Sequence, residues 1–302
     1  PPSLALLSQP PIETPGVRYF DPLTGESVDV AIKSGGNPDL VPARLVDRRL
    51  SVQVRPLRDF DFALSADYNL VRSRNAPAVL PSASLAVVAA FPERFARDPG
   101  GVLVRVDQRP VSLAEQEEQQ LRYGINLTVP LSLLGIGRPD APRAGRVQLS
   151  ASHTILLDSR LLLRAGTEPI DLLSRDSVGF GSGSKPRHQF DATLGYAERG
   201  LGVRLKVERR SASFLDISGL EGANVLRFQP LTTVDLRAFA EGSRLLRGIG
   251  WLKGTRFSLA AVNLTNSRER VRDESGVTPL SYQPAYRDPT GRTIELEFRK
   301  AF

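Results

Sequence analysis

Long segments that alternate between apolar and polar side chains most constrain the fold of this chain of 302 residues. In DFDFALSADYNLVR (59–72), every second position from Phe60 to Leu70 is apolar. A period of two indicates a strand with one apolar and one polar face. A mean globular strand has only about five to six residues. Ten residues at about 3.3 Å each, tilted near 40°, rise roughly 25 Å, the height of the apolar band on a transmembrane barrel.

The same alternation recurs along the chain and predicts an all-β protein, a transmembrane antiparallel β-barrel. Short connections follow some strands, whereas long connections rich in Pro, Gly, Ser and Arg precede the first strand and follow the second, fourth, sixth and eighth. Outer-membrane barrels place short turns on one rim and long loops on the other. Strands are expected near 44–56, 59–72, 119–131, 146–157, 188–197, 201–210, 228–241, 254–264 and 292–302.

One long connection contains a helix candidate, PSASLAVVAAFPERF (81–95). Ser82 or Ser84 is the expected N-cap, because a Ser side chain accepts hydrogen bonds from the first free N–H groups of a helix. We expect this helix to pack over the extracellular mouth of the barrel. No run approaches the roughly 18 apolar residues of a transmembrane helix.

The charge balance is basic, with a net charge of +7, and nearly all basic residues are arginine. The arginines are spread along the chain rather than clustered, which disfavours nucleic acid as a partner. A polyanionic membrane surface or a charged lumen explains this spread better. The chain contains no cysteine, which excludes disulfides and cysteine-ligated metals. It also contains no methionine, so we expect it to be a processed or truncated piece of a longer protein.

Three combinations of residues suggest catalysis only weakly. Ser152, His153 and Asp158 lack the turn that exposes a nucleophile, and the glycine-rich segment 178–188 with Lys185 is not followed by a helix, as a phosphate loop requires. Carboxylates at i and i+2 are more typical of lumen-facing charges opposed by arginines; they are Asp59 with Asp61 and Glu295 with Glu297.

His153 and His188 are the only two histidines, and we expect them to be interfacial polar residues. Two distant histidines without cysteine do not indicate a zinc site. The sequence therefore predicts no enzyme, no cofactor and no metal.

Three segments carry a resemblance to a known family. SGGNPDLVPAR (34–44) resembles the GNP-D/N-L-x-P-E segment that precedes a strand in TonB-dependent outer-membrane receptors, with Ala43 at the usual Glu position. Residues 257–302 resemble the last hairpin of these receptors, in which a long loop leads to a final strand ending in Phe. Residues 91–112 also resemble a receptor loop.

The resemblance implies that the chain is the C-terminal part, about nine strands, of a 22-stranded barrel. Residues 1–43 would be an extracellular loop, and 44–302 the barrel segment. The plug domain and TonB box of the family are absent from this chain. An unpaired strand edge in hydrocarbon is costly. We therefore expect the remaining N-terminal strands and the plug as partners, on a separate chain or segment.

The implied function is the import of a scarce bulky ligand, of the siderophore, cobalamin or oligosaccharide class, across the outer membrane of a Gram-negative bacterium. The implied partners are the TonB complex, the outer-membrane assembly machinery and lipopolysaccharide. Expected ligand-binding residues in the last extracellular loop are Arg268, Arg270, Arg272, Tyr282 and Tyr286. The expected assembly signal is Leu296, Phe298 and Phe302.

Other readings remain open. The five loop residues can instead pair with loop acids or with lipopolysaccharide phosphates. The barrel can be an anchor or docking scaffold for a surface complex that does not transport. An outer-membrane lipase or protease and a soluble β-sandwich or carbohydrate-binding module are further alternatives, although a sandwich has shorter strands and a polar outward face.

Overall fold

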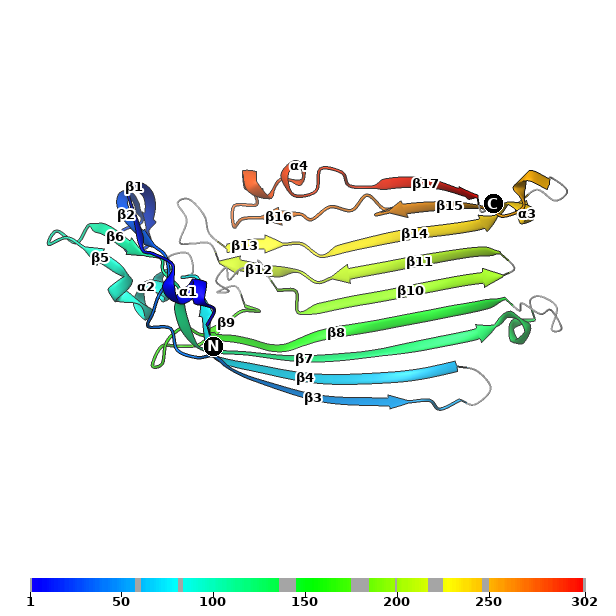
Figure 1. Cartoon of the computed structure of the whole chain (residues 1–302), viewed down its shortest axis with the longest axis horizontal. Coiled ribbons are helices and arrows are strands. Elements are labelled where there is room, and N and C mark those ends of the chain that lie inside the picture. Colours follow the sequence, from blue (N-terminus) through cyan, green and yellow to red (C-terminus); the bar gives the residue numbers. More distant parts are fainter. Residues whose placement is uncertain are drawn as a thin grey trace.

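The computed structural model describes residues 2–57, 61–80, 84–135, 145–174, 185–198, 200–216, 225–245 and 250–300. Within these ranges the chain forms three β-sheets and a few short helices, so the expected all-β class is confirmed. The strands of the largest sheet run side by side along the length of the molecule (Figure 1).

The largest sheet is an antiparallel meander, in which each strand pairs with the next long strand of the chain. Each of the nine ranges expected from the sequence overlaps one of its strands. A short strand, β9 (Ile170–Asp171), also pairs with one of them. The long strands are β3 (Arg44–Val54), β4 (Asp61–Ala78), β7 (Val111–Pro130), β8 (Arg146–Leu162), β10 (His188–Glu198), β11 (Leu201–Arg210), β14 (Leu231–Glu241), β15 (Thr255–Val262) and β17 (Thr293–Lys300).

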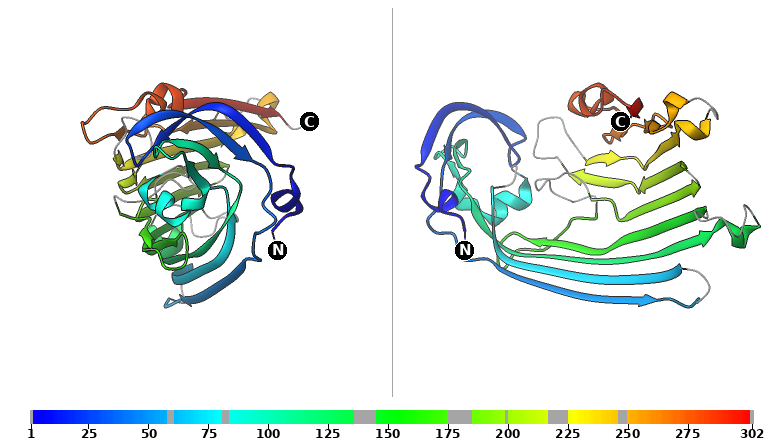
Figure 2. Two further views of the ribbon diagram at one scale, coloured as in Figure 1. Left: turned by 90° about the vertical axis from the view of Figure 1, so that its left-hand side faces the viewer. Right: turned by 45° about the vertical axis from the view of Figure 1, so that its right-hand side comes forward.

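The large sheet is curved and open. Viewed along the strands, it forms an arc from β3 at the bottom to β17 at the top (Figure 2, left). In the described part of the chain, β3 pairs only with β4, and β17 pairs only with β15. The sheet therefore has two free edges, a concave face and a convex face.

Three strands are longer than the sequence predicts. β4 continues to Ala78, β7 already begins at Val111, and β8 continues to Leu162. The apolar alternation fails in these extensions because charged and amide residues occupy both faces, as in AEQEEQQ (114–120). Cross-strand ion pairs connect the extensions instead, for example Arg74 with its Cα partner Glu115.

Residues 1–43, expected to be a loop, contain regular secondary structure. After α1 (Leu4–Ser8), the strands β1 (Ile12–Asp21) and β2 (Glu26–Ser34) form a hairpin. The hairpin pairs with segments from the connection after β4, in the sheet order β1-β2-β6-β5, with β5 (Phe95–Arg97) and β6 (Leu103–Asp107). We call this four-stranded sheet, with α1 and α2 (Leu85–Ala90), the cap, because it lies over the end of the large sheet that bears the long connections (Figures 1 and 2). The hairpin itself is local, because β1 pairs with β2, whereas its further partner β6 lies in a distant connection that local pattern does not reveal.

The principal hydrophobic core lies beneath the cap. It combines Val87 of α2, Val106 of β6 and Leu161 of β8, all with side chains at most 1% exposed. Ser84 caps α2 by accepting a hydrogen bond from the Val87 N–H at 3.3 Å, as expected, whereas Ser82 lies outside the described residues. The helix is shorter than expected, because Pro92 disfavours helical backbone at Phe91. The 3₁₀ turn η1 (Pro92–Arg94) follows.

The segment SGGNPDL fastens the cap to the large sheet. The buried Asn37 side chain donates from Nδ2 to the Pro110 carbonyl at 2.8 Å, immediately before β7 begins. Its Oδ1 accepts from the Asp39 N–H at 3.1 Å. Gly36 has no room for a side chain, because a Cβ would lie 2.7 Å from the backbone N of Gln9. The segment thus sets the position from which the chain enters β3.

A third, smaller sheet occupies the same end of the molecule as the cap. It consists of β12 (Ser213–Asp216), β13 (Val225–Phe228) and β16 (Val271–Arg272). The last long connection also contains η4 (Leu280–Tyr282) and α4 (Pro284–Arg287). The opposite end of the molecule carries shorter connections, which contain η2 (Leu131–Leu134), α3 (Gly242–Leu245) and η3 (Gly250–Leu252).

Candidate functional site

The convex face of the large sheet is apolar over most of its length. One row of cross-strand Cα partners shows how the strand registers produce this face. The row crosses eight strands without a polar residue, from β4 to β17. Its members are Phe62, Leu127, Leu149, Leu194, Leu205, Leu236, Ala261 and Ile294.

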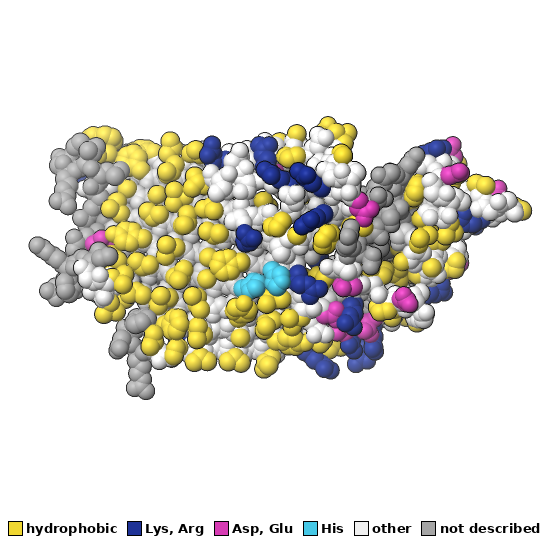
Figure 3. Space-filling view, turned by 180° about the vertical axis from the view of Figure 1, so that it is seen from behind, with side chains coloured by type: hydrophobic (Ala, Val, Ile, Leu, Met, Phe, Trp, Pro, Cys, Tyr) yellow, Lys and Arg dark blue, Asp and Glu magenta, His cyan; other side chains and the backbone are white. Residues whose placement is uncertain are grey.

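No second layer covers these side chains in the described part of the chain. Leu194, in the central strand, is 46% exposed, and Leu296 of the edge strand β17 is 80% exposed. Figure 3 shows apolar side chains covering the convex face from the short-connection end to past its middle. Soluble monomers rarely expose contiguous apolar patches larger than a few hundred Å². This face, hereafter the apolar band, therefore needs an apolar environment.

Aromatic side chains lie toward both ends of the apolar band. Near the short-connection end, the rings of Phe257 and Phe298 are 5.0 Å apart on β15 and β17. Further along the strands, the Tyr68 hydroxyl donates to Gln119 Oε1 at 3.1 Å. Aromatic girdles at the two interfaces are typical of outer-membrane barrels. Of the expected assembly-signal residues, Leu296 and Phe298 lie on this face, whereas Phe302 lies outside the described residues.

The two histidines lie together on the convex face, a juxtaposition that sequence reasoning missed. Tyr123 Oη is 2.8 Å from His153 Nδ1, and His153 Nε2 is 3.3 Å from His188 Nδ1. The imidazole rings stack with centroids 5.3 Å apart, at the boundary where the apolar band ends (Figure 3). The contact follows from the register in which β8 pairs with β10, and the sequence alone does not reveal that register. No group of three or more His, Cys, Asp or Glu side chains suited to a metal occurs among the described residues.

Beyond the histidines, the convex face becomes charged. Arg72 Nε is 2.6 Å from Glu117 Oε2, and Arg74 Nε is 2.7 Å from Glu115 Oε2. We call this zone the charged rim; it comprises Arg44, Arg48, Arg72, Arg74, Glu115, Glu117, Asp158 and Arg160. Figure 3 shows basic and acidic side chains gathered on this side of the histidines. Such side chains suit the polar layer above a hydrocarbon core.

The concave face carries polar residues at the intervening positions. Arg204 lies opposite Arg237 in the pairing of β11 with β14, and Asp191 lies opposite Glu208. Glu295 and Glu297 share a hollow with Arg237 and Arg256. At the directly paired positions like charges therefore face each other, whereas Glu295 and Glu297 lie near arginines of neighbouring strands, as expected.

Small residues keep the concave face close-packed at particular points. A Cβ on Gly124 would lie 2.7 Å from the Ala151 carbonyl oxygen of the next strand.

The polar concave face also carries an aromatic side chain that contacts a cation. The Arg256 guanidinium lies 3.9 Å from the centre of the Phe239 ring.

The expected ligand-binding residues of the last loop do not form one cluster. Tyr282 packs edge-on against Phe228 at 5.7 Å and belongs to the small core beneath the third sheet. Arg272 lies in β16 of that sheet, and the Arg270 carbonyl accepts from the Gln229 N–H at 2.8 Å. Arg268 packs beside Gly291. These contacts stabilise the loop itself.

Of the five expected ligand-binding residues, Tyr286 lines an open groove. Its side chain is 67% exposed beside an open groove of about 720 Å³ at the concave face of β11, β14 and β15. The residues lining the groove also include Glu208, Asp235 and Glu269. Arg287, another lining residue, forms an ion pair with Glu269 at 3.1 Å. Sequence reasoning missed these acids because strand alternation alone does not show which loop covers them.

Lys185, which the sequence suggested as part of a phosphate loop, is bound to the Glu118 carboxylate and lies 3.4 Å from Ser159 Oγ. It therefore fastens its connection to β7 and β8. Residues 178–184 of that segment lie outside the described residues.

Comparison of the sequence with protein-family models and with curated proteins gives no match. Among the helices of the described ranges, none is long and apolar enough to cross a membrane.

Proposed function

We propose that this chain is the C-terminal barrel segment of a TonB-dependent outer-membrane receptor, which binds and imports a scarce bulky ligand. The observation that carries the proposal is the apolar band, exposed across consecutive meander strands and backed by a polar concave face. Contact with lipid removes the apolar side chains of such a face from water, which is energetically favourable.

The dimensions of the band support a membrane location. On β4 the apolar positions run from Phe62 to Leu70, which corresponds to about 25–30 Å at roughly 3.3 Å per residue. A tilt of about 40° lowers this to somewhat more than 20 Å, close to the apolar height of about 25 Å in outer-membrane barrels. The aromatic residues and the charged rim follow in the order that a membrane interface requires.

The free edges of β3 and β17 support the proposal of partner strands. In hydrocarbon, an unpaired backbone N–H or C=O costs several kcal/mol, so spanning sheets close into barrels. We therefore propose that the remaining N-terminal strands pair with β3 and β17, and that a plug occupies the concave side. The TonB complex would act through that plug.

The groove beside Tyr286 supports ligand capture at the end of the molecule that bears the long connections. It opens on the concave side, where a ligand entering a barrel from outside would pass. Its surplus of carboxylates favours neutral polyhydroxy or cationic groups on the part of the ligand that it meets.

Uptake by whole cells tests the proposal. Cells with and without the intact gene are supplied with radiolabelled iron siderophores, cobalamin and oligosaccharides, in backgrounds with and without a working TonB complex. We expect uptake of one ligand class that requires both the protein and TonB. An outer-membrane protein that imports none of them would support the scaffold alternative.

A further inference from the structure

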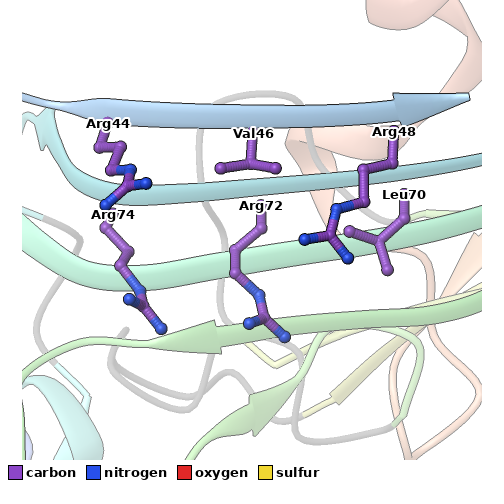
Figure 4. A pocket seen from close by; sticks show the side chains of 6 residues that line it. All are labelled: Arg44, Val46, Arg48, Leu70, Arg72 and Arg74. Atoms are coloured by element: carbon purple, nitrogen blue, oxygen red, sulfur yellow. The ribbon is translucent and has the colours of Figure 1, made fainter.

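A cleft opens within the charged rim, between the edge strand β3 and its neighbour β4. It has a volume of about 230 Å³ and is lined by Arg44, Arg48, Arg72 and Arg74, with Val46 and Leu70. Figure 4 shows all four guanidinium groups on the same face of the two strands. Four arginines that converge on one cleft indicate an anionic ligand.

The arginines of this cleft are not equally neutralised. Arg72 and Arg74 bind Glu117 and Glu115 of β7. Among the described residues, neither Arg44 nor Arg48 has an ion-pair partner, and both are exposed. The cleft therefore keeps an excess positive charge on the side of β3. Arginine donates paired hydrogen bonds to phosphate as it does to carboxylate, and a phosphate group, with its several acceptor oxygens, can engage more than one arginine at once.

The side chains of Arg44 and Arg48 extend along the convex face. Arg44 and Arg48 lean from β3 over β4, rather than outward past the free edge of β3 (Figure 4). In this position their guanidinium groups can reach a ligand seated on the convex face.

The residues next to the cleft are apolar. Along β3, the convex positions after Arg48 are Leu50, Val52 and Val54, which are 50% to 64% exposed, and Tyr68 is the Cα partner of Leu50. A ligand on this surface meets arginines at one end and an apolar strand face at the other. A free phosphate ion uses only the first part, whereas a phosphorylated lipid uses both.

We propose that this cleft binds the phosphate groups of a phosphorylated lipid headgroup, with the acyl chains lying along the apolar band below it. The inference rests on the proposed membrane location. Lipopolysaccharide is the phosphorylated lipid of the outer leaflet in which the rim would lie, and Arg44 and Arg48 are the residues that distinguish this site from the rest of the rim.

Lipid binding to the full-length protein in detergent tests this inference. Bisphosphorylated lipid A is titrated and counted by native mass spectrometry, for the natural protein and for the double variant Arg44→Gln/Arg48→Gln. Arg49→Gln is the matched control, because Arg49 lies on the same strand but on the concave face, where it pairs with Asp47 at 3.1 Å. Lipid A without phosphates and inorganic phosphate are the comparison ligands.

We expect the double variant to bind bisphosphorylated lipid A about tenfold more weakly, since two charge-assisted contacts are lost. Arg49→Gln should change binding by less than about twofold, dephosphorylated lipid A should bind equally to all variants, and millimolar inorganic phosphate should not displace the lipid. Unchanged binding in the double variant, or inorganic phosphate binding as tightly as the lipid, would overturn the inference.

A single-cysteine label at Leu50 separates this inference from the proposed function. If the label reports lipid while the double variant binds lipid A normally, only the headgroup site is wrong. If the label reports water, the membrane location itself is wrong.

Discussion

Arg97 and Asp21 form a buried ion pair that joins two distant parts of the cap. Arg97 Nη1 lies 2.6 Å from Asp21 Oδ2, and Nη2 lies 2.7 Å from Oδ1. The Asp21 side chain is 1% exposed, and that of Arg97 is 22% exposed. Hydrogen bonds from Arg97 hold the pKa of the Asp21 carboxyl below its ordinary value of 3.8, against the opposing effect of burial. The hairpin of β1 and β2 is thus held to β5 by charge as well as by strand pairing.

The cap should loosen in acid. Because the folded pKa of Asp21 is depressed, its stabilising contribution is complete above about pH 3.8, the ordinary value for the unfolded chain. It is lost as the pH falls through the lower folded pKa. We expect the protection of Ile12–Ser34 against hydrogen exchange, measured relative to the intrinsic exchange rate at each pH, to fall below this range in the detergent-solubilised protein. Protection that stays constant down to pH 2 would contradict the assigned role.

Asp21→Asn should destabilise the cap by about 2 kcal/mol at neutral pH, because a partly buried arginine loses its charged partner. Asp29→Asn is the matched control on β2, where Asp29 and Arg18 are 3.8 Å apart and both side chains are 68% exposed. An exposed pair of this kind contributes about 0–1 kcal/mol. Equal acceleration of hydrogen exchange in both variants would show that the burial of Asp21 is unimportant.

Arginine on the apolar band should prevent barrel formation in the membrane more than arginine on the concave face. Leu194→Arg places a charge in the central strand on the convex side, at an expected cost of about 2–4 kcal/mol near the middle of a bilayer. Thr193→Arg changes the neighbouring residue, which lies on the concave face, and should cost less than about 1 kcal/mol. Folding into lipid vesicles, followed by urea titration, compares the two variants. A greater loss for Thr193→Arg would mean that the two faces are assigned wrongly.

Two strand glycines should respond differently to the same substitution. Gly124→Ala places a methyl group 2.7 Å from a backbone carbonyl oxygen, so β7 and β8 must separate, at a cost of about 1–3 kcal/mol. In Gly195→Ala, the nearest atom to the new methyl group is 3.8 Å away, and we expect stability to be unchanged or slightly higher. Thermal unfolding in detergent checks both variants, and a smaller loss for Gly124→Ala than for Gly195→Ala would contradict the close packing of β7 against β8.

The long strands could be predicted wherever one face meets apolar surroundings along its whole length. Phe190, Ala192 and Leu194 alternate with Gln189, Asp191 and Thr193, so a sequence pattern alone is enough to place β10. The N-terminal part of β7 escaped prediction because Glu115 and Glu117 lie at convex positions, where they pair with arginines rather than contact an apolar medium. The alternation of apolar and polar residues reflects what each face of a strand contacts. At the charged rim the convex face contacts charged side chains rather than an apolar medium.

Contacts between distant segments could not be predicted from local pattern. His153 and His188 meet only because the two strands pair in one particular register. The cap depends on the pairing of β2 with β6, whose partner residues are more than 70 positions apart. The arginine cleft likewise needs β3 beside β4 with Arg44 opposite Arg74.

A cysteine scan of β10 tests the central claim most directly, because these 302 residues contain no cysteine that would compete for the label. Single cysteines at consecutive positions from Phe190 to Gly195 are spin-labelled in the full-length protein in lipid vesicles. The electron paramagnetic resonance signal then gives the collision rate of each label with oxygen, which concentrates in lipid, and with a water-soluble nickel complex. We predict that Phe190, Ala192 and Leu194 meet oxygen, whereas Asp191, Thr193 and Gly195 meet the nickel complex. Equal access to the nickel complex along the whole strand would contradict a membrane-facing sheet.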